Sequence, residues 1–201
     1  AIYSEKYPEI YEAKVLQEDL VAIAFYKNIS PDFIKEEGKI ILEMKHFLQH
    51  TKLLIKPEKI EKLKKANVLV VGLGGVGSFA AEFLARAGVG NLTIVDGDVV
   101  DITNVNRQLP ALHTTVGKDK VEVVAERILD INPEINLVKM NEFLSPERMD
   151  EILESNHFDY VLDCIDSVSP KLALIKACRR RKIKIVSSMG AGGKMDPSKV
   201  M

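Results

Sequence analysis

The sequence predicts a doubly wound α/β fold: a mostly parallel, Rossmann-like sheet with helices on both faces, preceded by a helical N-terminal extension. From residue 67 onward, short runs of β-branched and leucine residues alternate with segments of helical periodicity. The first run ends in a glycine-rich turn, VLVVGLGGVGS, that leads directly into an amphipathic segment. Parallel strands need crossover connections, so this alternation indicates right-handed βαβ units.

The strands and helices follow from local signals. A helix is predicted from 77 to about 88, where Gly88 ends it, and a second over 117–130, with one apolar face. Two further helices begin at serine–proline pairs, Ser145-Pro146 and Ser169-Pro170, because serine caps a helix and proline suits its first position. The predicted strands are 67–72, 91–96, 135–140, 160–165 and 184–188.

Residues 1–65 are interpreted as a helical extension and 66–201 as the nucleotide-binding domain. The extension has no glycine except Gly38, and prolines at 31 and 57 mark helix starts. The 201 residues suffice for one α/β core with an appendage.

Composition excludes several classes of protein. A net charge of −1 rules out a general polycation, so any nucleic-acid contact must come from a local patch. The longest uncharged stretch, 66–81, is shorter than a membrane span and contains four glycines. Two cysteines, Cys164 and Cys178, form neither a disulfide framework nor a zinc pair. We therefore expect no zinc and a reducing compartment, the cytoplasm.

The glycine turn predicts a phosphate site. In GLGGVG, Gly72 permits a tight turn, Gly74 lets phosphate approach the backbone, and Gly77 lets the helix pack on the strand; Gly75 is a fourth glycine. The helix N-terminus adds a positive dipole end. Asp96 ends the second strand and is placed to bind ribose. These residues indicate adenosine with phosphates, which fits both NAD and ATP.

Two cations favour ATP. Arg107 and Lys120 follow the ribose-binding strand, and Lys120 falls in the first turn of its helix, among free backbone donors. ATP carries about four negative charges against about two on the NAD pyrophosphate, and its cleavage builds charge that fixed cations must meet. The alternative is that both residues are ordinary surface cations.

Acidic residues after two strands complete the site. In YVLDCIDSVSP, Asp163 lies near the end of the predicted strand and Asp166 follows it, at the carboxyl edge where open α/β sheets bind ligands. Asp166, further into the loop, is the candidate magnesium ligand. Asp163 is interpreted as a buried, hydrogen-bonded acid, and Asp98 and Asp101 as acids of a solvated turn.

These motifs resemble the ThiF/MoeB superfamily of ATP-dependent, carboxylate-adenylating enzymes, which share the fold of ubiquitin-activating enzymes. GLGGVGS, VDGD, TNVNRQ, VGKDK and DCIDS occur in family order between about 62 and 199. The resemblance implies that Gly75 approaches phosphate, that Asp96 binds ribose, and that Asp166 helps to hold Mg²⁺. It also implies a triphosphate site made by Asn104, Arg107, Gln108 and Lys120; Arg107, Lys120 and Asp166 would act in catalysis.

Within the superfamily, IDSVSPKLALIKACRRRKI and GAGGKMDPSKV resemble the tRNA threonylcarbamoyladenosine dehydratases. The resemblance implies that ATP adenylates the carboxylate of threonylcarbamoyladenosine in tRNA and that an internal nitrogen closes the ring and expels AMP. It further implies a homodimer, a sulfur-carrier or desulfurase partner, and a monovalent cation. Eukaryotic relatives are associated with mitochondria, which is the alternative location.

Seven basic and no acidic residues lie over 171–184. We predict that Lys171, Arg179, Arg180 and Arg181 contact tRNA phosphates near the nucleotide. The alternative is that the three arginines simply close a helix, where cations suit the dipole.

The chain departs from the family pattern in two places. His50 stands where relatives carry an arginine that reaches the ATP phosphates, and the C-terminal portion expected of a complete dehydratase after DPSKV is missing. Three other functions stay open: an activating enzyme for a ubiquitin-like or sulfur-carrier protein, an NAD-dependent dehydrogenase, and a catalytically silent scaffold.

Overall fold

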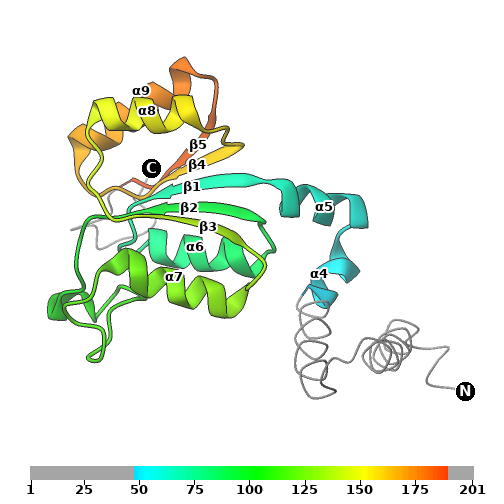
Figure 1. The fold of residues 1–201 in the computed structure, drawn as a ribbon, viewed down its shortest axis with the longest axis horizontal. Helices are drawn as coiled ribbons and strands as arrows, with labels where there is room; N and C mark the ends of the chain where they lie inside the picture. Colours follow the sequence, from blue (N-terminus) through cyan, green and yellow to red (C-terminus); the bar gives the residue numbers. More distant parts are fainter. Residues whose placement is uncertain (1–47, 190–201) are drawn as a thin grey trace, which may run out of the picture. The chain divides into compact units, whose positions relative to one another are not determined.

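The computed structural model describes residues 48–189, and the chain divides into two units, 1–55 and 56–201 (Figure 1). The described part of the first unit contains one helix, α4 (Gln49–Leu54). The helix predicted to begin at Ser30 lies outside the described residues. In the second unit α5 (Pro57–Lys65) begins at the predicted proline. The division into two domains at residue 65 stays a prediction.

The second unit contains a five-stranded sheet in the order β3-β2-β1-β4-β5, in which every neighbouring pair is parallel. The strand order reverses between β1 and β4, so the sheet is doubly wound, and the predicted fold class is confirmed. The strands are β1 (Asn67–Val71), β2 (Asn91–Val95), β3 (Asn136–Met140), β4 (Tyr160–Asp163) and β5 (Lys184–Ser187).

Two helical layers cover the sheet. The first layer is α6 (Gly77–Arg86) and α7 (Lys120–Ile131), and the second is α8 (Pro146–Ser155) and α9 (Val168–Arg180) (Figure 1).

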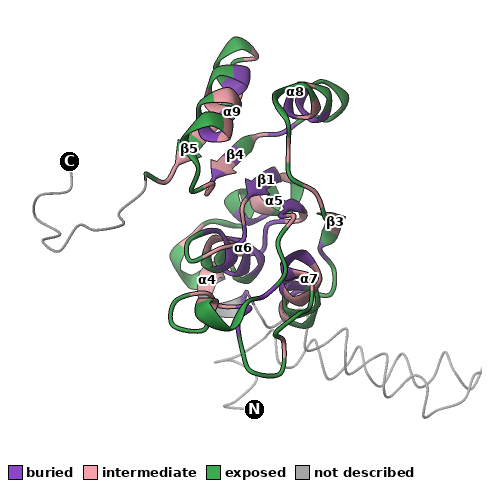
Figure 2. Cartoon of the chain, turned by 90° about the vertical axis from the view of Figure 1, so that its left-hand side faces the viewer, coloured by how far each residue is buried: buried purple, intermediate pink, exposed green. Residues whose placement is uncertain are grey.

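Each layer closes its own hydrophobic core. Along β1, Val68 and Val70 pack into the core with α6 and α7, whereas Leu69 and Val71 pack into the core with α8 and α9. Successive side chains on a strand point to opposite faces, so an uninterrupted apolar run is what a sheet buried on both faces requires. Figure 2 shows the buried residues gathered along β1 and on the inner sides of the helices.

The structure corrects the predicted start of the helix at 117. Gly117 adopts φ +85°, outside the right-handed helical region, and its N–H donates to the carbonyl of Val100 (2.8 Å). The helix therefore begins at Lys120.

The helix predicted at Ser169 begins two residues earlier, with Ser167 in the N-cap position. Pro170 is then the third helical residue, which is allowed because the first-turn N–H groups have no partner within the helix. The strand predicted over 160–165 ends at Asp163, whose carboxylate accepts the N–H of Ile165 (3.1 Å) and starts the turn.

Within the described range 48–189, we find no helix with the combination of length and apolar composition needed to cross a bilayer.

A nearly buried carboxylate joins the two helices of the first layer. Glu82 on α6 accepts hydrogen bonds from Arg86 (2.8 Å) and from Arg127 of α7. The Arg127 hydrogen bond, and after it that of Arg86, holds the pKa of Glu82 below its ordinary value of 4.5 despite burial.

We expect Glu82→Gln to destabilise the fold by about 1.5 kcal/mol, the lower end for hydrogen bonds to charged groups, or roughly 3–6 °C in Tm. Because the folded-state pKa is lowered, this stabilisation is complete above about pH 4.5 and is lost as the pH falls through that lowered pKa. Melting curves of both proteins at several pH values check this. A Tm difference that persists unchanged in acid would contradict the assignment.

Candidate functional site

A pocket of about 760 Å³ lies at the carboxyl edge of the sheet. Residues at or just after the ends of all five strands line it, as expected at the switch point of a doubly wound sheet. Gly77 is the one of the ten residues singled out in the sequence for a nucleotide site that does not line it. The pocket brings together the other nine: Gly72, Gly74, Gly75, Asp96, Asn104, Arg107, Gln108, Lys120 and Asp166.

The glycine turn forms one wall of this pocket. Gly72 adopts φ +90°, and a Cβ on Gly77 would lie 1.7 Å from the carbonyl oxygen of Gly72. Gly77 is therefore required for the close packing of α6 against the end of β1. Gly74 borders open space instead, because a Cβ there would meet only Gln108 Nε2, at 3.7 Å. The backbone at Gly74 is thus accessible to a ligand.

Asp96 links the glycine turn to the end of β2. One carboxylate oxygen accepts the N–H of Leu73 (2.6 Å) and the other accepts the N–H of Asp98 (2.8 Å). Burial is the largest influence on this carboxyl and raises its pKa, against the lowering effect of the two N–H donors. Asp96 is only 9% exposed but borders the pocket, so its carboxylate can accept a further donor from a ligand.

Lys120 extends from the first turn of α7 into the pocket wall. Its side chain is 6% exposed, and its Nζ lies 2.8 Å from a carboxylate oxygen of Asp98. One prediction is corrected here: the N–H of Lys120 is not free, because it donates to the Asp98 carbonyl (3.0 Å). Asp98 is an exposed acid, as predicted, with its side chain 54% exposed, and it also acts as the counterion of Lys120 in the pocket wall. The Asp98 carboxylate fixes the position of Lys120 Nζ, and a phosphate oxygen can take the place of that carboxylate as its partner.

The segment between β2 and α7 supplies the other predicted polar groups. Asn104, in the 3₁₀ turn η1 (Ile102–Asn104), accepts the N–H of Asp101 through its side chain (3.2 Å). Arg107 donates to the Thr103 carbonyl (3.1 Å) and is exposed at the pocket. Gln108 Oε1 is buried and has no hydrogen-bond partner among the described residues. A buried acceptor without a donor is costly, so a ligand donor beside Gln108 would stabilise this wall.

The two carboxylates after β4 have different environments. Asp163 is fully buried and accepts hydrogen bonds from Lys171 Nζ (2.8 Å) and Ser187 Oγ (2.6 Å). Asp166 is exposed in the loop and lines the pocket. The interpretation of Asp163 as a buried, hydrogen-bonded acid is confirmed, and Asp166 is the carboxylate of this pair that a ligand can reach.

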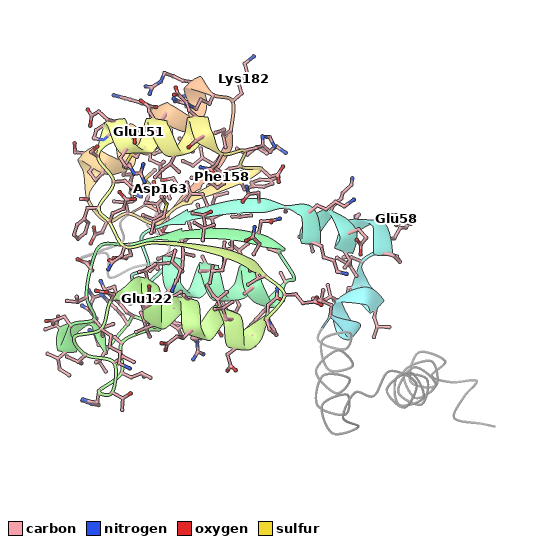
Figure 3. All side chains as sticks on the ribbon, viewed as in Figure 1. Glu58, Glu122, Glu151, Phe158, Asp163 and Lys182 are labelled. Carbon is pink, nitrogen blue, oxygen red and sulfur yellow. The ribbon has the colours of Figure 1, made fainter. Side chains whose placement is uncertain are left out.

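The prediction for Lys171 is wrong. Its side chain is 8% exposed and bonded to Asp163, so it cannot present its charge to tRNA. In Figure 3 Lys182, which follows the end of α9, lies well away from Asp163 at the end of β4. A helix of 13 residues is roughly 20 Å long, so the arginines at its end lie far from the pocket rather than beside it.

Two of those arginines are engaged in ion pairs. Arg180 and Arg181 both contact Asp150 of α8, at 2.9 and 2.6 Å, and Arg181 also contacts Glu154 at 2.7 Å. Arg179 is exposed, with no ion-pair partner among the residues that the structure describes. Arg180 and Arg181 therefore link α9 to α8 through ion pairs, a role that neither sequence interpretation included.

Neither cysteine has the character of a nucleophile. Burial, the largest influence in both cases, raises the pKa of Cys164 and of Cys178 to about 11, so both thiols are protonated at neutral pH. In residues 48–189 there is no cluster of three or more histidine, cysteine or acidic side chains suited to a metal. The side chain of His50 is outside the described set.

The apolar end of the pocket was not predicted from the sequence. Phe143 follows β3, and its ring lies against Gly97, where a Cβ would come within 2.7 Å of it. Glu142 precedes it and is held by Arg148 (3.1 Å). The sequence did contain a signal for this contact, because a glycine, Gly97, directly follows Asp96. Only the tertiary structure shows that the Phe143 ring packs against this glycine. Other pocket residues not anticipated are Leu144, Met149, Ser188 and Met189.

Known proteins are similar to this chain in both fold and sequence. The family model described as the ThiF family matches residues 48–201. The tRNA threonylcarbamoyladenosine dehydratase of Escherichia coli is 50% identical over 135 residues, which cover 67% of this chain and 50% of that protein. The molybdopterin-synthase adenylyltransferase of Haemophilus influenzae is 41% identical over 136 residues, covering 68% of this chain and 54% of that protein.

A crystal structure of the E. coli dehydratase, TcdA, in complex with ATP superposes with a TM-score of 0.73 at 45% identity. The match covers 77% of this chain and 63% of that one. The chain spans between 50% and 61% of the length of the curated dehydratases from three bacteria that it matches. Because the family model matches more than half of the residues of this chain, the chain belongs to the ThiF family.

Proposed function

We propose that this chain is the nucleotide-binding part of an ATP-dependent tRNA threonylcarbamoyladenosine dehydratase. The observation that carries the proposal is the pocket itself, in which Arg107, Lys120 and Asp166 line the same cavity as the glycine turn and Asp96. The 50% identity of the chain to the E. coli dehydratase and its structural similarity to the ATP complex of that protein support the same function.

The residues fit ATP. Gly74 leaves space for phosphate at the N-terminus of α6, and Asp96 is placed for the ribose. Arg107 and Lys120 supply two positive charges, and Gln108 offers a buried acceptor that lacks a donor. An NAD site would explain the glycines and Asp96 but would leave Arg107, Lys120 and Asp166 without a role.

The pocket residues also fit an Mg²⁺ ion that is bound to the phosphates of ATP. Magnesium is usually held by one or two carboxylates together with phosphate oxygens, rather than by an all-protein cage. Asp166 supplies one exposed carboxylate at the pocket, whereas Asp163 is already occupied by Lys171. Asp166 would therefore hold the metal.

ATP, when bound, supplies an activated phosphorus to which a carboxylate can be joined. Arg107 and Lys120 would neutralise the charge that develops on the departing pyrophosphate, and Asp96 would fix the ribose so that the reacting atoms meet. An internal nitrogen of the modified nucleoside then replaces AMP, which closes the ring. This scheme needs no thiolate, in agreement with the raised pKa of Cys164.

The partners predicted from the resemblance belong to this proposal. For a homodimer, α6 offers an exposed apolar face: Val76, Phe79 and Phe83 are 52%, 40% and 63% exposed at helical spacing. Arg179 is the member of the predicted tRNA set that is free to contact phosphate. A sulfur-carrier or desulfurase partner, a monovalent cation and the cytoplasmic location stay predictions.

Loss of the cyclic nucleoside is the direct test. In cells in which this gene is disrupted, mass spectrometry of tRNA nucleosides is expected to show threonylcarbamoyladenosine in place of its cyclic form. Complementation with the full-length gene restores the cyclic form. Unchanged cyclic nucleoside in the disrupted strain would refute the proposed substrate.

The second candidate is an adenylating enzyme for a carrier protein, favoured by the 41% identity to the molybdopterin-synthase adenylyltransferase. Exchange of pyrophosphate into ATP separates the two candidates. We expect stimulation by tRNA bearing threonylcarbamoyladenosine and none by carrier proteins. Stimulation by a carrier protein alone would favour the second candidate.

Asp96→Ala is expected to raise the KM for ATP by at least about tenfold, with a smaller loss in kcat, because a charged hydrogen bond contributes about 1.5–3 kcal/mol to binding. Steady-state pyrophosphate release at varied ATP measures both constants. Asp96→Asn is the matched control, because it keeps one acceptor for the Leu73 N–H. Equal damage to KM and kcat would show that Asp96 acts in the chemical step.

A further inference from the structure

A buried lysine joins three segments that form one wall of the pocket. Lys171, in the first turn of α9, donates from Nζ to the carboxylate of Asp163 at the end of β4 (2.8 Å). The same Nζ donates to the carbonyl of Ser188, just after β5 (2.8 Å). The side chains of Lys171 and Asp163 are 8% and 0% exposed. Charges so fully removed from water are tolerated only when they are paired.

Both oxygens of the Asp163 carboxylate accept hydrogen bonds. One oxygen accepts Lys171 Nζ and Ser187 Oγ, and the other accepts the N–H of Ile165. The backbone adds a further tie, since the N–H of Ser188 donates to the Asp163 carbonyl (2.9 Å). The loop after β4 and the end of β5 are therefore held at one fixed separation.

Both of the joined segments carry pocket residues. Ile165 and Asp166 lie in the loop that Asp163 begins, and Ser188 and Met189 follow β5. An apolar residue at 171 would fill the same space but would not select one arrangement, whereas a buried, hydrogen-bonded ion pair does so through directional bonds. The pair also neutralises Asp163 and so leaves Asp166 as the charged acceptor of this loop.

Building on the proposed function, we infer that Lys171 is a positioning residue for the metal–nucleotide complex. Its ammonium group, held between Asp163 and the Ser188 carbonyl, sets the position of Asp166 relative to the opposite wall of the pocket. Lys171 does not line the pocket, so we assign it no contact with metal or nucleotide. Its effect reaches the site through the loop 163–167.

The test compares nucleotide affinity with and without metal, by calorimetry on the full chain. Lys171→Met is expected to weaken ATP binding in Mg²⁺ by about tenfold, the lower end for loss of a group that orients a metal ligand. Binding of ATP in EDTA is expected to be unchanged, because the glycine turn and Asp96 are untouched. Lys176→Met is the matched control: this lysine lies on the same helix, is exposed, and does not line the pocket.

A second variant guards against a folding defect. Lys171→Met leaves Asp163 buried and unpaired, so the double variant Lys171→Met/Asp163→Asn removes both charges and is expected to fold while still losing the Mg²⁺-dependent part of the affinity. Wild-type affinity in Mg²⁺ for the double variant, or an equal loss with and without metal, would overturn the inference. Absence of ATP binding by the unmodified protein would instead refute the proposed function.

Discussion

Lys120→Ala is expected to reduce the rate of pyrophosphate release by at least about 100-fold, the usual cost of losing one fixed donor to a charged transition state. The structure explains why the effect should be large. Lys120 is 4% exposed and lines the pocket, where its ammonium group is held by Asp98, so it is a fixed rather than a mobile cation. Its removal also leaves the carboxylate of Asp98, formerly its counterion, facing the phosphates.

This second effect can be separated from the first. In the double variant Asp98→Asn/Lys120→Ala the repulsive carboxylate is absent, so we expect partial recovery of rate relative to Lys120→Ala alone. Lys118→Ala is the control, because Lys118 is exposed and does not line the pocket. Single-turnover measurement of pyrophosphate release provides the comparison. A rate close to that of the unmodified protein in Lys120→Ala would remove Lys120 from the mechanism.

Two alanine substitutions in the glycine turn are expected to fail for different reasons. Gly77→Ala places a methyl group 1.7 Å from the Gly72 carbonyl oxygen, which forces α6 away from β1. We expect it to lower the free energy of unfolding by about 3 kcal/mol or more, the upper range for overpacking. That loss corresponds to roughly 6–12 °C in Tm for a chain of this size.

Gly74→Ala is expected to keep its stability and to lose nucleotide binding. Its new methyl group meets nothing closer than Gln108 Nε2 at 3.7 Å, but it occupies the space through which phosphate would approach the backbone. Thermal melting and ATP calorimetry on both variants distinguish the two effects. An unstable Gly74→Ala, or a stable Gly77→Ala, would show that the two glycines have been assigned the wrong roles.

Most of the architecture could be predicted from the sequence. The alternation of apolar runs with helical segments, and the glycine turn between the first pair, rest on interactions between near neighbours in the chain. The two covering layers follow from the general handedness and packing rules for parallel sheets. The strand order was not predicted, because doubly wound sheets occur in more than one order, and it came from the structure. Element ends were less predictable, because they depend on contacts such as that of Gly117 with Val100.

The basic segment 171–184 shows the limit of composition as a guide. The seven basic residues cannot be told apart in the sequence. Their burial and ion-pair partners differ once α8 and the end of β5 pack beside them. Lys171 is buried against Asp163, and Arg181 is held by Asp150 and Glu154, whereas Arg179 remains exposed. The partners of Lys171, Arg180 and Arg181 all include residues on other elements.

The sequence by itself determined the doubly wound fold, the glycine turn, and Asp96, Arg107, Lys120 and Asp166 as polar residues of the pocket, because these depend on local pattern and on where strands end. Only the tertiary structure decided which charges are available. It paired Lys120 with Asp98 and Lys171 with Asp163, and it set Phe143 against Gly97. The physical reason is that an ion pair or a ring contact depends on distance in space, which a sequence pattern does not specify for residues on separate elements.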